Sequence, residues 1–451
     1  MSHSSTSSGA SVMTALIASL DDTTIQDFAV TARRDYLRRH NPGNGAAVHA
    51  DLSCTVATPP ASGSSNIVYT LEFSDGAKWV LRIPFEEWSD AQAHRMRLDI
   101  VAQQYILSHT SIPIPRIYSY DCTSDNALGH PYMLMAFVHG TRLVDVWNDP
   151  TWWTGERTKA RLLNSYARHM VELARLEFDA IGCLDKVEPD GPHFIAPFPT
   201  TSPGPFKSAH TYISTVLNEE LRTHHDPFLA ALHIFLNSLL ERQYDGAPFI
   251  LRHPDPDSQN VFVDETGEVS GLIDWDNVQI RPRQLGALAF PAWLTVDWDP
   301  IAYFMYADEP HCDTREDLHM YRNMYVDGIA KASDGALSAV TRNSHIICSI
   351  MMAICNEYTR QDVVYHLGTY MFGSAWLTIE LVEGMKGSAW FNRDPDAIAE
   401  VKESDKNRLA PEEYDLRTAD GSNESDGEDV EADSSNDSNE SNGSGGAEVA
   451  I

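Results

Sequence analysis

Apolar and polar residues alternate in two neighbouring segments of the first third of the chain. Residues 66–73 and 78–84 place apolar side chains at every second position, and Ser74-Asp75-Gly76-Ala77 lies between them. Alternation with a period of two is typical of half-buried strands, and Asp-Gly supplies the positive φ angles of a tight turn. These segments therefore predict a β-hairpin.

The pattern around this hairpin predicts a small sheet with a helix. Residues 91–108 have helical spacing and end before the Ile112-Pro-Ile-Pro115 break. Further strands are expected at 116–120 and 132–138, and another helix at 24–39 precedes the hairpin. The order after that first helix is strand, strand, helix, strand, strand.

The remainder of the chain is predicted to be mainly helical. Apolar residues recur at spacings of three and four over six segments, as in amphipathic helices. The six segments are 157–178, 209–223, 227–242, 315–332, 345–358 and 361–385. A second hairpin is predicted between the third and fourth helices, from strands at 259–264 and 268–274 that turn at Glu265-Thr266-Gly267.

The ends of the second hairpin carry polar residues in a pattern suited to phosphoryl transfer. Asn260 follows Asp255 by five residues, and Asp274 comes fourteen residues later, at the other end of the hairpin. Asp255 can accept the proton of an attacking hydroxyl, while Asn260 and Asp274 offer the oxygen ligands that Mg²⁺ prefers. Arg82 adds a planar cation for the phosphates of ATP. The pattern predicts an ATP-dependent small-molecule kinase.

Composition and charge limit the classes of protein to consider. Of the 451 residues, 43% are hydrophobic, which is enough for two domains or one two-lobed unit. Lys and Arg number 33 against 65 Asp and Glu, so nucleic acid is not expected as a partner. The longest strongly apolar run, Ile346–Cys355, is half of a membrane span. Scattered cysteines and the lack of a secretory signal predict a soluble cytoplasmic protein.

We expect four parts along the chain. They are a partly disordered and then helical flank at 1–48, a nucleotide-binding N-lobe at 49–139, a catalytic and acceptor-binding C-lobe at 140–403, and an acidic tail at 404–451. Residues 411–451 hold thirteen Asp or Glu and one Arg, so the tail carries about 12 of the 32 net negative charges. Because it has few apolar residues to bury, the tail is predicted to be disordered.

Several motifs resemble the aminoglycoside phosphotransferase family. His253 to Asn260 reads H-x-D-x-x-x-x-N, and Ile273-Asp274-Trp275-Asp276 follows. Other matches, which look like the fungal branch, are Asn66-Ile-Val-Tyr, Trp79-Val-Leu-Arg82-Ile-Pro, Thr110 to Pro115, Ile181-Gly182-Cys-Leu and Arg281-Pro-Arg-Gln-Leu285. The resemblance extends from about Leu52 to Trp298 and weakens up to Trp390. It implies an α+β, two-lobed, protein-kinase-like fold, with a small antiparallel sheet in the N-lobe and a mostly helical C-lobe.

The resemblance also implies roles for single residues. It makes Asp255 the catalytic aspartate and Asn260 and Asp274 the ligands of Mg²⁺. The hinge that contacts the adenine of ATP would consist of Met135, Ala136, Phe137 and Val138.

The nucleotide site departs from the family's pattern at three points. Arg82 stands where the family has a strand lysine, and Asp99 stands where it has a helix glutamate. We expect Arg82 and Asp99 to pair and to take part in nucleotide binding. The loop at 58–65 has a single glycine, Gly63. These departures favour the main alternative, a catalytically weak pseudokinase or nucleotide-binding interaction protein.

Other interpretations of the same residues remain open. Asp255 taken alone would be a turn former, and Arg82 a surface charge on its strand. A protein kinase lacks support because no activation segment that runs from Asp-Phe-Gly to Ala-Pro-Glu is present. A metal-dependent hydrolase would use Asp255, Asp257, Asp274 and Asp276.

The acceptor is expected to be a hydroxylated small molecule, and a cationic one is among the candidates. Asp297, Asp299, Asp308 and Glu309 would attract an amine, or would simply form a solvated surface. Five tryptophans suit either an aromatic pocket or the core, and core packing is preferred. These are Trp147, Trp152, Trp153, Trp293 and Trp298.

Overall fold

The structure is a computed structural model that describes residues 13–40, 51–63, 65–188, 191–199, 204–299 and 313–386. By its contacts the chain divides into two units, Met1–Ala399 and Glu400–Ile451. The second unit lies outside the described residues. The predictions of disorder in residues 1–12 and of the acidic tail at 404–451 concern residues that the structure does not describe.

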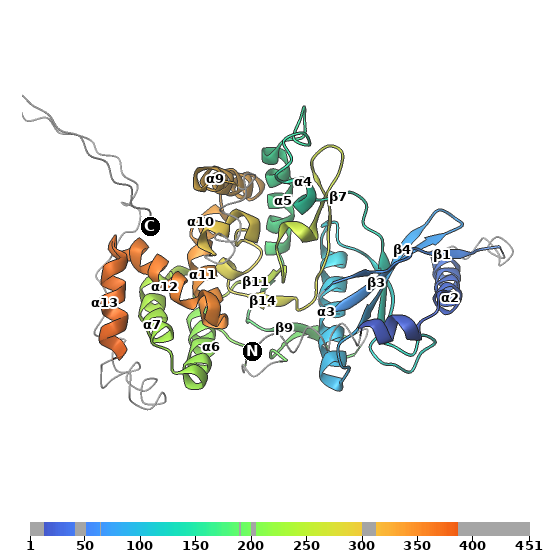
Figure 1. Cartoon of the computed structure of the whole chain (residues 1–451), viewed down its shortest axis with the longest axis horizontal. Coiled ribbons are helices and arrows are strands. Elements are labelled where there is room, and N and C mark those ends of the chain that lie inside the picture. The colour runs from blue at the N-terminus through green and yellow to red at the C-terminus, as the bar shows by residue number, and fades with distance from the viewer. Residues whose placement is uncertain are drawn as a thin grey trace, which may run out of the picture. The chain divides into compact units, whose positions relative to one another are not determined.

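The first hairpin forms with the predicted bounds and is the centre of an antiparallel sheet (Figure 1). Its strands are β3 (Asn66–Phe73) and β4 (Lys78–Pro84). The strand order is β1-β3-β4-β6-β5, and β2 pairs with β3. The other four strands are β1 (Cys54–Val56), β2 (Ala61–Ser62), β5 (Ile117–Asp121) and β6 (Tyr132–Ala136). The short strands β1 and β2 were not predicted, since two or three residues carry too little alternation.

Helices α2 (Asp22–His40) and α3 (Asp90–His109) accompany this sheet. Trp79, Leu81 and Ile83 of β4 are buried in one apolar cluster with residues of α2. Because side chains alternate along a strand, Arg82 lies on the opposite face. Met133 and Met135 of β6 pack with α3 in a separate cluster. The pleat thus directs Arg82 away from the apolar cluster that contains α2.

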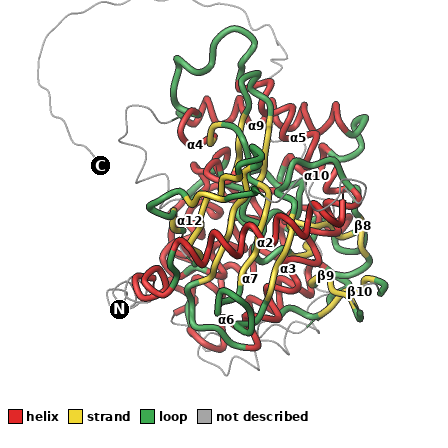
Figure 2. The backbone as a smooth tube through the Cα atoms, turned by 90° about the vertical axis from the view of Figure 1, so that its right-hand side faces the viewer, coloured by secondary structure: helices red, strands yellow, loops and turns green. Residues whose placement is uncertain are grey.

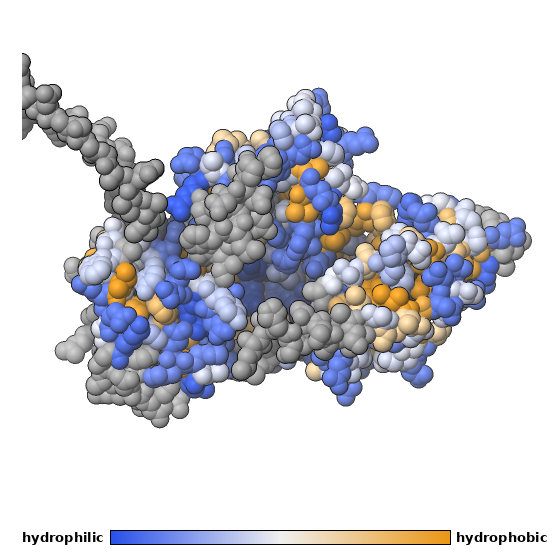
Figure 3. Space-filling model, in the orientation of Figure 1, coloured by the Kyte–Doolittle hydropathy of each residue, from blue (hydrophilic) through white to orange (hydrophobic). Residues whose placement is uncertain are grey.

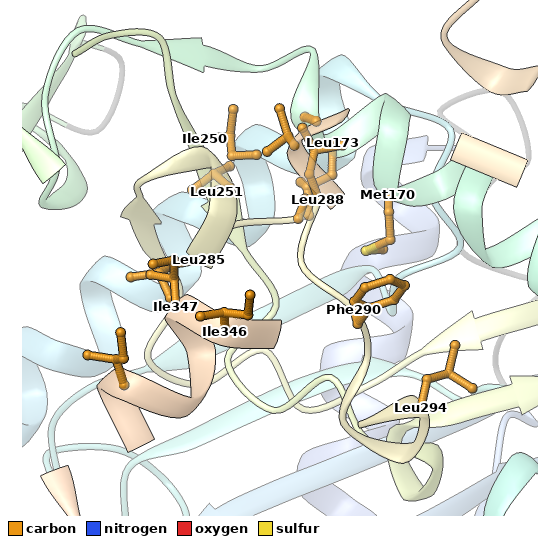
Figure 4. Close-up of a cluster of buried hydrophobic side chains, with 14 of the residues drawn as sticks. Met170, Leu173, Ile250, Leu251, Leu285, Leu288, Phe290, Leu294, Ile346 and Ile347 are labelled. Carbon is orange, nitrogen blue, oxygen red and sulfur yellow. The ribbon is translucent and has the colours of Figure 1, made fainter. Parts of the chain in front are cut away.

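The second half of the described chain is largely helical, as predicted. Its helices are α4 (Leu143–Val146), α5 (Lys159–Ala174), α6 (Ala209–His224), α7 (Pro227–Leu239), α9 (Arg315–Ala332), α10 (Ser338–Arg342), α11 (Ser344–Cys355), α12 (Glu357–Phe372) and α13 (Ala375–Lys386). Apolar side chains of α5, β11 (Phe249–Arg252) and α11 share one core, of which Figure 4 shows a part. There Ile347 lies beside Leu285, and Met170 lies beside Phe290.

Two predicted helices differ from the structure. The helix expected at 157–178 ends at Ala174, and Glu177–Phe178 forms strand β8 instead. The helix expected at 361–385 is two helices, α12 and α13, because Gly373 ends α12 with a φ of 67°. Glycine adopts this left-handed conformation without strain and commonly ends helices.

Three small sheets also lie in this part of the chain. Their orders are β14-β11-β8, β13-β12-β7 and β10-β9. The remaining bounds are β7 (Thr141–Arg142), β9 (Cys183–Lys186), β10 (His193–Ala196), β12 (Val261–Val263), β13 (Val269–Leu272) and β14 (Gln279–Arg281). The view of Figure 2 shows β8, β9 and β10 gathered at one side. The predicted second hairpin is present as β12 and β13, with shorter strands than expected.

The described architecture is the expected α+β one, with an antiparallel sheet before a helical region. Hydrophilic residues cover most of the described surface on the face in Figure 3, between scattered apolar ones. None of the helices in the described ranges has both the length and the apolar character needed to cross a bilayer.

Candidate active site

Residues that are distant in sequence line one cavity of about 420 Å³. Arg82 comes from β4, Arg252 and Asp255 from the end of β11 and the loop after it, and Asp274 from the end of the second hairpin. The other charged residues of the lining are Asp276, two residues after Asp274, and Arg281 of β14. The structure therefore brings together Arg82, Asp255 and Asp274, which the sequence had singled out.

The loop after β11 holds the carboxylate of Asp255 in a fixed orientation. Asn260 donates from Nδ2 to Asp255 Oδ2 at 2.8 Å and to the Asp255 carbonyl at 3.0 Å. Gln259 Nε2 donates to the same Oδ2 at 3.0 Å. Asp257 caps the short helix η3 (Ser258–Asn260) by accepting from Ser258 N. Asp255 Oδ1 has no hydrogen-bond partner among the described residues, so it can receive a proton from a ligand.

The second hairpin brings Asp274 beside Asn260, as predicted. Ile273 N donates to the carbonyl of Asn260 at 3.0 Å, and Val261 pairs with Leu272. Asp274 has a φ of 63° and Asn277 a φ of 67°. Asp and Asn are the side-chain-bearing residues that tolerate this left-handed conformation best. The two left-handed residues turn the chain sharply after β13.

Arg82 binds the carboxylates that follow this hairpin. Its Nη2 donates to Asp274 Oδ1 at 2.9 Å, and its Nη1 and Nη2 donate to the two oxygens of Asp276 at 2.7 Å each. With its amide oxygen oriented toward Arg82, Asn66 also accepts from Nη2 at 2.8 Å. Arg82 is therefore a half-buried partner of these carboxylates and not a free charge on the strand.

The expected ion pair between Arg82 and Asp99 is not formed in the structure. Asp99 Oδ1 instead accepts from the backbone N–H groups of Asn277 and Val278, at 2.8 and 3.1 Å. The carboxylates of Asp274 and Asp276 already bind the guanidinium of Arg82. The short side chain of Asp99 instead supports the turn that carries these two residues. Burial, reinforced by the charge of Asp276, raises the pKa of Asp99 well above its ordinary value.

His253 connects the loop after β11 with the end of the second hairpin. Its Nε2 lies 2.9 Å from the carbonyl of Ile273, and its ring packs edge-on against Trp275 at 4.5 Å. Burial lowers the pKa of His253 to about 4, so the ring is neutral at pH 7 and its Nε2–H donates to that carbonyl. His253 braces the loop and does not line the cavity.

The predicted adenine hinge begins at the end of β6 and does not line this cavity. Met135 and Ala136 belong to β6, and Ala136 N donates to the carbonyl of Arg116 at 2.8 Å. Phe137 N donates to the carbonyl of Lys78 at 3.3 Å. Val138 lies against Gly271 of β13, where a Cβ atom would be 2.1 Å from Val138 Cγ1. The hinge thus contacts both β4 and the second hairpin.

Of the features considered for a cationic acceptor, those that the structure describes have other partners. Asp297 binds Arg322 through both oxygens, at 2.6 and 3.0 Å. Asp308 and Glu309 lie outside the described residues. Trp147 and Trp293 are buried in the main core, and Trp152, Trp153 and Trp298 pack against it, as preferred from the sequence.

Sequence reasoning missed three charged residues of the cavity, Asp276, Arg252 and Arg281. From the sequence, Asp276 had a role only in the hydrolase alternative, whereas in the structure it holds Arg82. Arg252 precedes His253 directly, and Arg281 lies in a motif already noted. Their proximity depends on the pairing of β11 with β14, which the sequence did not predict.

The profile of the phosphotransferase enzyme family matches residues 56–285, which are 230 of the 451 residues. The chain belongs to this family. The match contains every residue that lines the cavity, and phosphotransferases of this family have the protein-kinase-like fold that the sequence predicted.

Curated relatives of this chain include altered inheritance of mitochondria protein 9 from two yeasts. The Candida albicans protein is 26% identical over 126 residues, which cover 27% of this chain and 20% of the relative. The Lodderomyces elongisporus protein is 30% identical over 87 residues, covering 19% and 14%. The chain thus matches a fifth or less of the length of these relatives. Both are named as mitochondrial, which contradicts the expected cytoplasmic location.

Solved structures similar to this member of the family include three that are named as small-molecule kinases or phosphotransferases. A macrolide 2'-phosphotransferase type I is 13% identical, with 78% of this chain and 95% of that chain covered and a TM-score of 0.39. A Plasmodium vivax ethanolamine kinase is 13% identical, with 78% and 85% covered and a TM-score of 0.40. A fructosamine-3-kinase homologue from Thermobifida fusca is 13% identical, with 73% and 91% covered and a TM-score of 0.40.

Proposed function

We propose that this phosphotransferase transfers the γ-phosphoryl group of ATP to a hydroxyl of a small molecule, with Mg²⁺ as the metal. The observation that carries the proposal is the meeting of Asp255, Asp274 and Arg82 at one cavity in a member of this family. Phosphoryl transfer needs little more from a protein than a positioned acceptor, a metal and a cation near the phosphates.

Asp255 would act as the base. Asn260 and Gln259 hold its Oδ2, so Oδ1 is the oxygen that would accept the proton of the acceptor hydroxyl. The acceptor oxygen forms a bond to the γ-phosphorus as the bond from that phosphorus to the β–γ bridging oxygen breaks, and ADP leaves. Proton transfer of this kind typically contributes about 100 to 10,000-fold to the rate, or roughly 3 to 5.5 kcal/mol.

Asn260 and Asp274 would hold Mg²⁺, and their chemistry fits this metal. Each offers a hard oxygen, and Asp274 Oδ2 has no hydrogen-bond partner within the described ranges. Those ranges contain no metal-binding group of three or more His, Cys, Asp or Glu, and the proposed pair includes only one such residue. Mg²⁺ takes its other ligands from water and phosphates. Bound there, the ion would neutralise charge on the phosphates.

Arg82 and the hinge would bind the nucleotide. Arg82 has five N–H donors and lines the cavity beside Asp274, so it would reach phosphate oxygens while remaining near its carboxylate partners. The adenine contacts would come from Met135 to Val138, by the family's pattern. Asp99 would act indirectly, by supporting the turn that carries Asp276.

A second candidate function is supported by one contact. Arg82 occupies Asp274 Oδ1, an oxygen of the proposed metal ligand, at 2.9 Å. A protein in which this ion pair persisted would bind nucleotide and transfer phosphate slowly, as a pseudokinase or a nucleotide-binding interaction protein does. Retention of the base and of both metal ligands favours the enzyme.

The test is to incubate the protein with Mg²⁺, ATP and a metabolite extract, and to search by mass spectrometry for a compound that gains a phosphate. We expect one class of hydroxylated metabolite to be phosphorylated, with ADP formed in equal amount. If no metabolite gains phosphate while Mg²⁺ and ATP still bind, the pseudokinase alternative is correct.

A further inference from the structure

Two arginines of the cavity have no part in the chemistry above. Arg252 ends β11 and Arg281 ends β14, and both line the cavity together with Asp255. The two strands are antiparallel, with Arg252 opposite Gln279 and Ile250 opposite Arg281. Opposite and alternate residues share one face of a sheet. The ladder therefore presents both guanidinium groups on the same face.

Arg281 is a cation without a carboxylate partner. Its guanidinium carbon lies 5.1 Å from the ring centres of both Phe198 and Tyr212. Burial lowers the pKa of Arg281 to about 10, so the side chain is still charged at pH 7. Within the described ranges Arg281 forms no ion pair and no hydrogen bond, whereas Arg82 in the same cavity binds two carboxylates.

Arg252 is a second arginine of the cavity without an ion pair among the described residues. Its Nη1 donates to the carbonyl of Leu285 at 3.2 Å, which fixes the side chain without neutralising it. The structure gives Arg252 no carboxylate within 4.0 Å among the residues described. The cavity therefore holds two arginines that form no ion pair with the residues described, so both are available to an anionic ligand.

We infer that the acceptor carries an anionic group, a carboxylate or a phosphate, that binds Arg252 and Arg281 while its hydroxyl faces Asp255. The inference rests on the proposed function. The planar forks of arginine match both kinds of anion, and a half-buried cation is stabilised by such a partner. An amine would meet two arginines, and of the three aspartates in the lining only Asp255, the proposed base, is not bound to Arg82.

The γ-phosphate of ATP is the other anion that these arginines could bind. The two sources differ in what a variant changes. If the anion belongs to the acceptor, loss of Arg281 weakens acceptor binding and leaves nucleotide binding unchanged. If it belongs to ATP, losing Arg281 raises the KM for ATP with every acceptor.

The turnover test uses a panel of hydroxy acids, sugar phosphates, neutral polyols and amino alcohols of similar size. We expect transfer to compounds with a carboxylate or phosphate, and a loss of roughly 30-fold or more in kcat/KM for them in Arg281→Gln, with the KM for ATP unchanged. Arg281→Lys should keep part of the activity. Arg242→Gln, an exposed arginine outside the cavity, is the matched control. Preference for amino alcohols would overturn the inference and leave the phosphotransferase proposal intact.

A binding test keeps the inference falsifiable if the panel contains no substrate. Inorganic phosphate and pyrophosphate should raise the unfolding temperature of the wild type and of Arg242→Gln, but not of Arg281→Gln, with and without saturating Mg²⁺ and AMP-PNP. Loss of the shift once AMP-PNP is bound would assign the arginines to the nucleotide and overturn the inference. A protein that shows the phosphate shift but never binds AMP-PNP would instead contradict the proposed function.

Discussion

The guanidinium of Arg82 and the carboxylate of Asp276 form two parallel hydrogen bonds of 2.7 Å each. This geometry is the bidentate arrangement that arginine favours with carboxylates. It connects β4 to the turn after β13, two segments separated by 194 residues in the sequence. The contact explains how a chain with arginine at the usual lysine position can keep this side chain at the site without the expected helix carboxylate.

The two carboxylates that hold Arg82 should differ in their effect on metal dependence. Asp274→Asn removes a proposed ligand, so we expect the Mg²⁺ concentration for half-maximal activity to rise roughly 10 to 100-fold. Asp276→Asn should raise the KM for ATP, because Arg82 loses its main partner, while the Mg²⁺ requirement stays near that of the wild type. Titration of Mg²⁺ at saturating ATP measures the difference. Equal Mg²⁺ curves for the two variants would rule out Asp274 as the specific ligand.

Gly271 should report on the adenine hinge. An alanine there would place its Cβ 2.1 Å from Val138 Cγ1, so the hinge or the hairpin must move. We expect Gly271→Ala to lower the free energy of unfolding by about 1 to 3 kcal/mol and to weaken AMP-PNP binding. Calorimetric titration and chemical denaturation measure the two effects.

Gly246→Ala is the control for this variant, since its Cβ would meet no atom within 4 Å. It should change neither stability nor nucleotide affinity appreciably. Gly271→Ala that is destabilised but binds AMP-PNP as tightly as the wild type would show that Val138 does not contact the nucleotide.

His253 should make stability depend on pH on the acidic side. Its pKa is about 4 in the folded protein, against about 6.5 when unfolded, so the unfolded state binds more protons between these values. The contribution of neutral His253 to the free energy of unfolding is complete above pH 6.5. It is lost as the pH falls toward 4, by at most about 3 kcal/mol. Denaturation at a series of pH values should show a shallower decline in His253→Gln.

His345 provides the comparison for His253. Burial lowers its pKa to about 3, and it packs against Trp298, away from the cavity. His345→Gln should also flatten the acidic decline in stability, but only His253→Gln should reduce kcat, because His253 supports the residue before Asp274. Equal kcat in the two variants would contradict the bracing role.

Much of the fold could be predicted from local patterns. The bounds of β3, β4 and α9 agree with the periodicity, because alternation and helical spacing are strong in these segments. Strands β8 and β14 were missed, since two or three residues form a strand only when a distant partner is present. The left-handed Gly373 inside an apolar stretch was the overlooked signal for the break between α12 and α13.

In the site, too, local patterns predicted some features, whereas others depend on residues that are distant in sequence. Asp255, Asn260 and Asp274 could be grouped from the sequence because one hairpin connects them. The partner of Arg82 could not, because two carboxylates compete with Asp99 and their positions depend on the turn at Asp274 to Asn277. Which charge pairs with which is a tertiary property that spacing does not determine.

The most direct test of the central claim compares Asp255→Asn with Asp257→Asn. Both change one loop carboxylate to an amide, and Asn retains the capping that Asp257 provides. The measurement is the initial rate of γ-phosphoryl transfer from labelled ATP into a metabolite extract, with AMP-PNP affinity measured alongside. We predict a rate lower by about 100 to 10,000-fold in Asp255→Asn at unchanged affinity, and a rate near that of the wild type in Asp257→Asn. Wild-type transfer by Asp255→Asn would contradict the account.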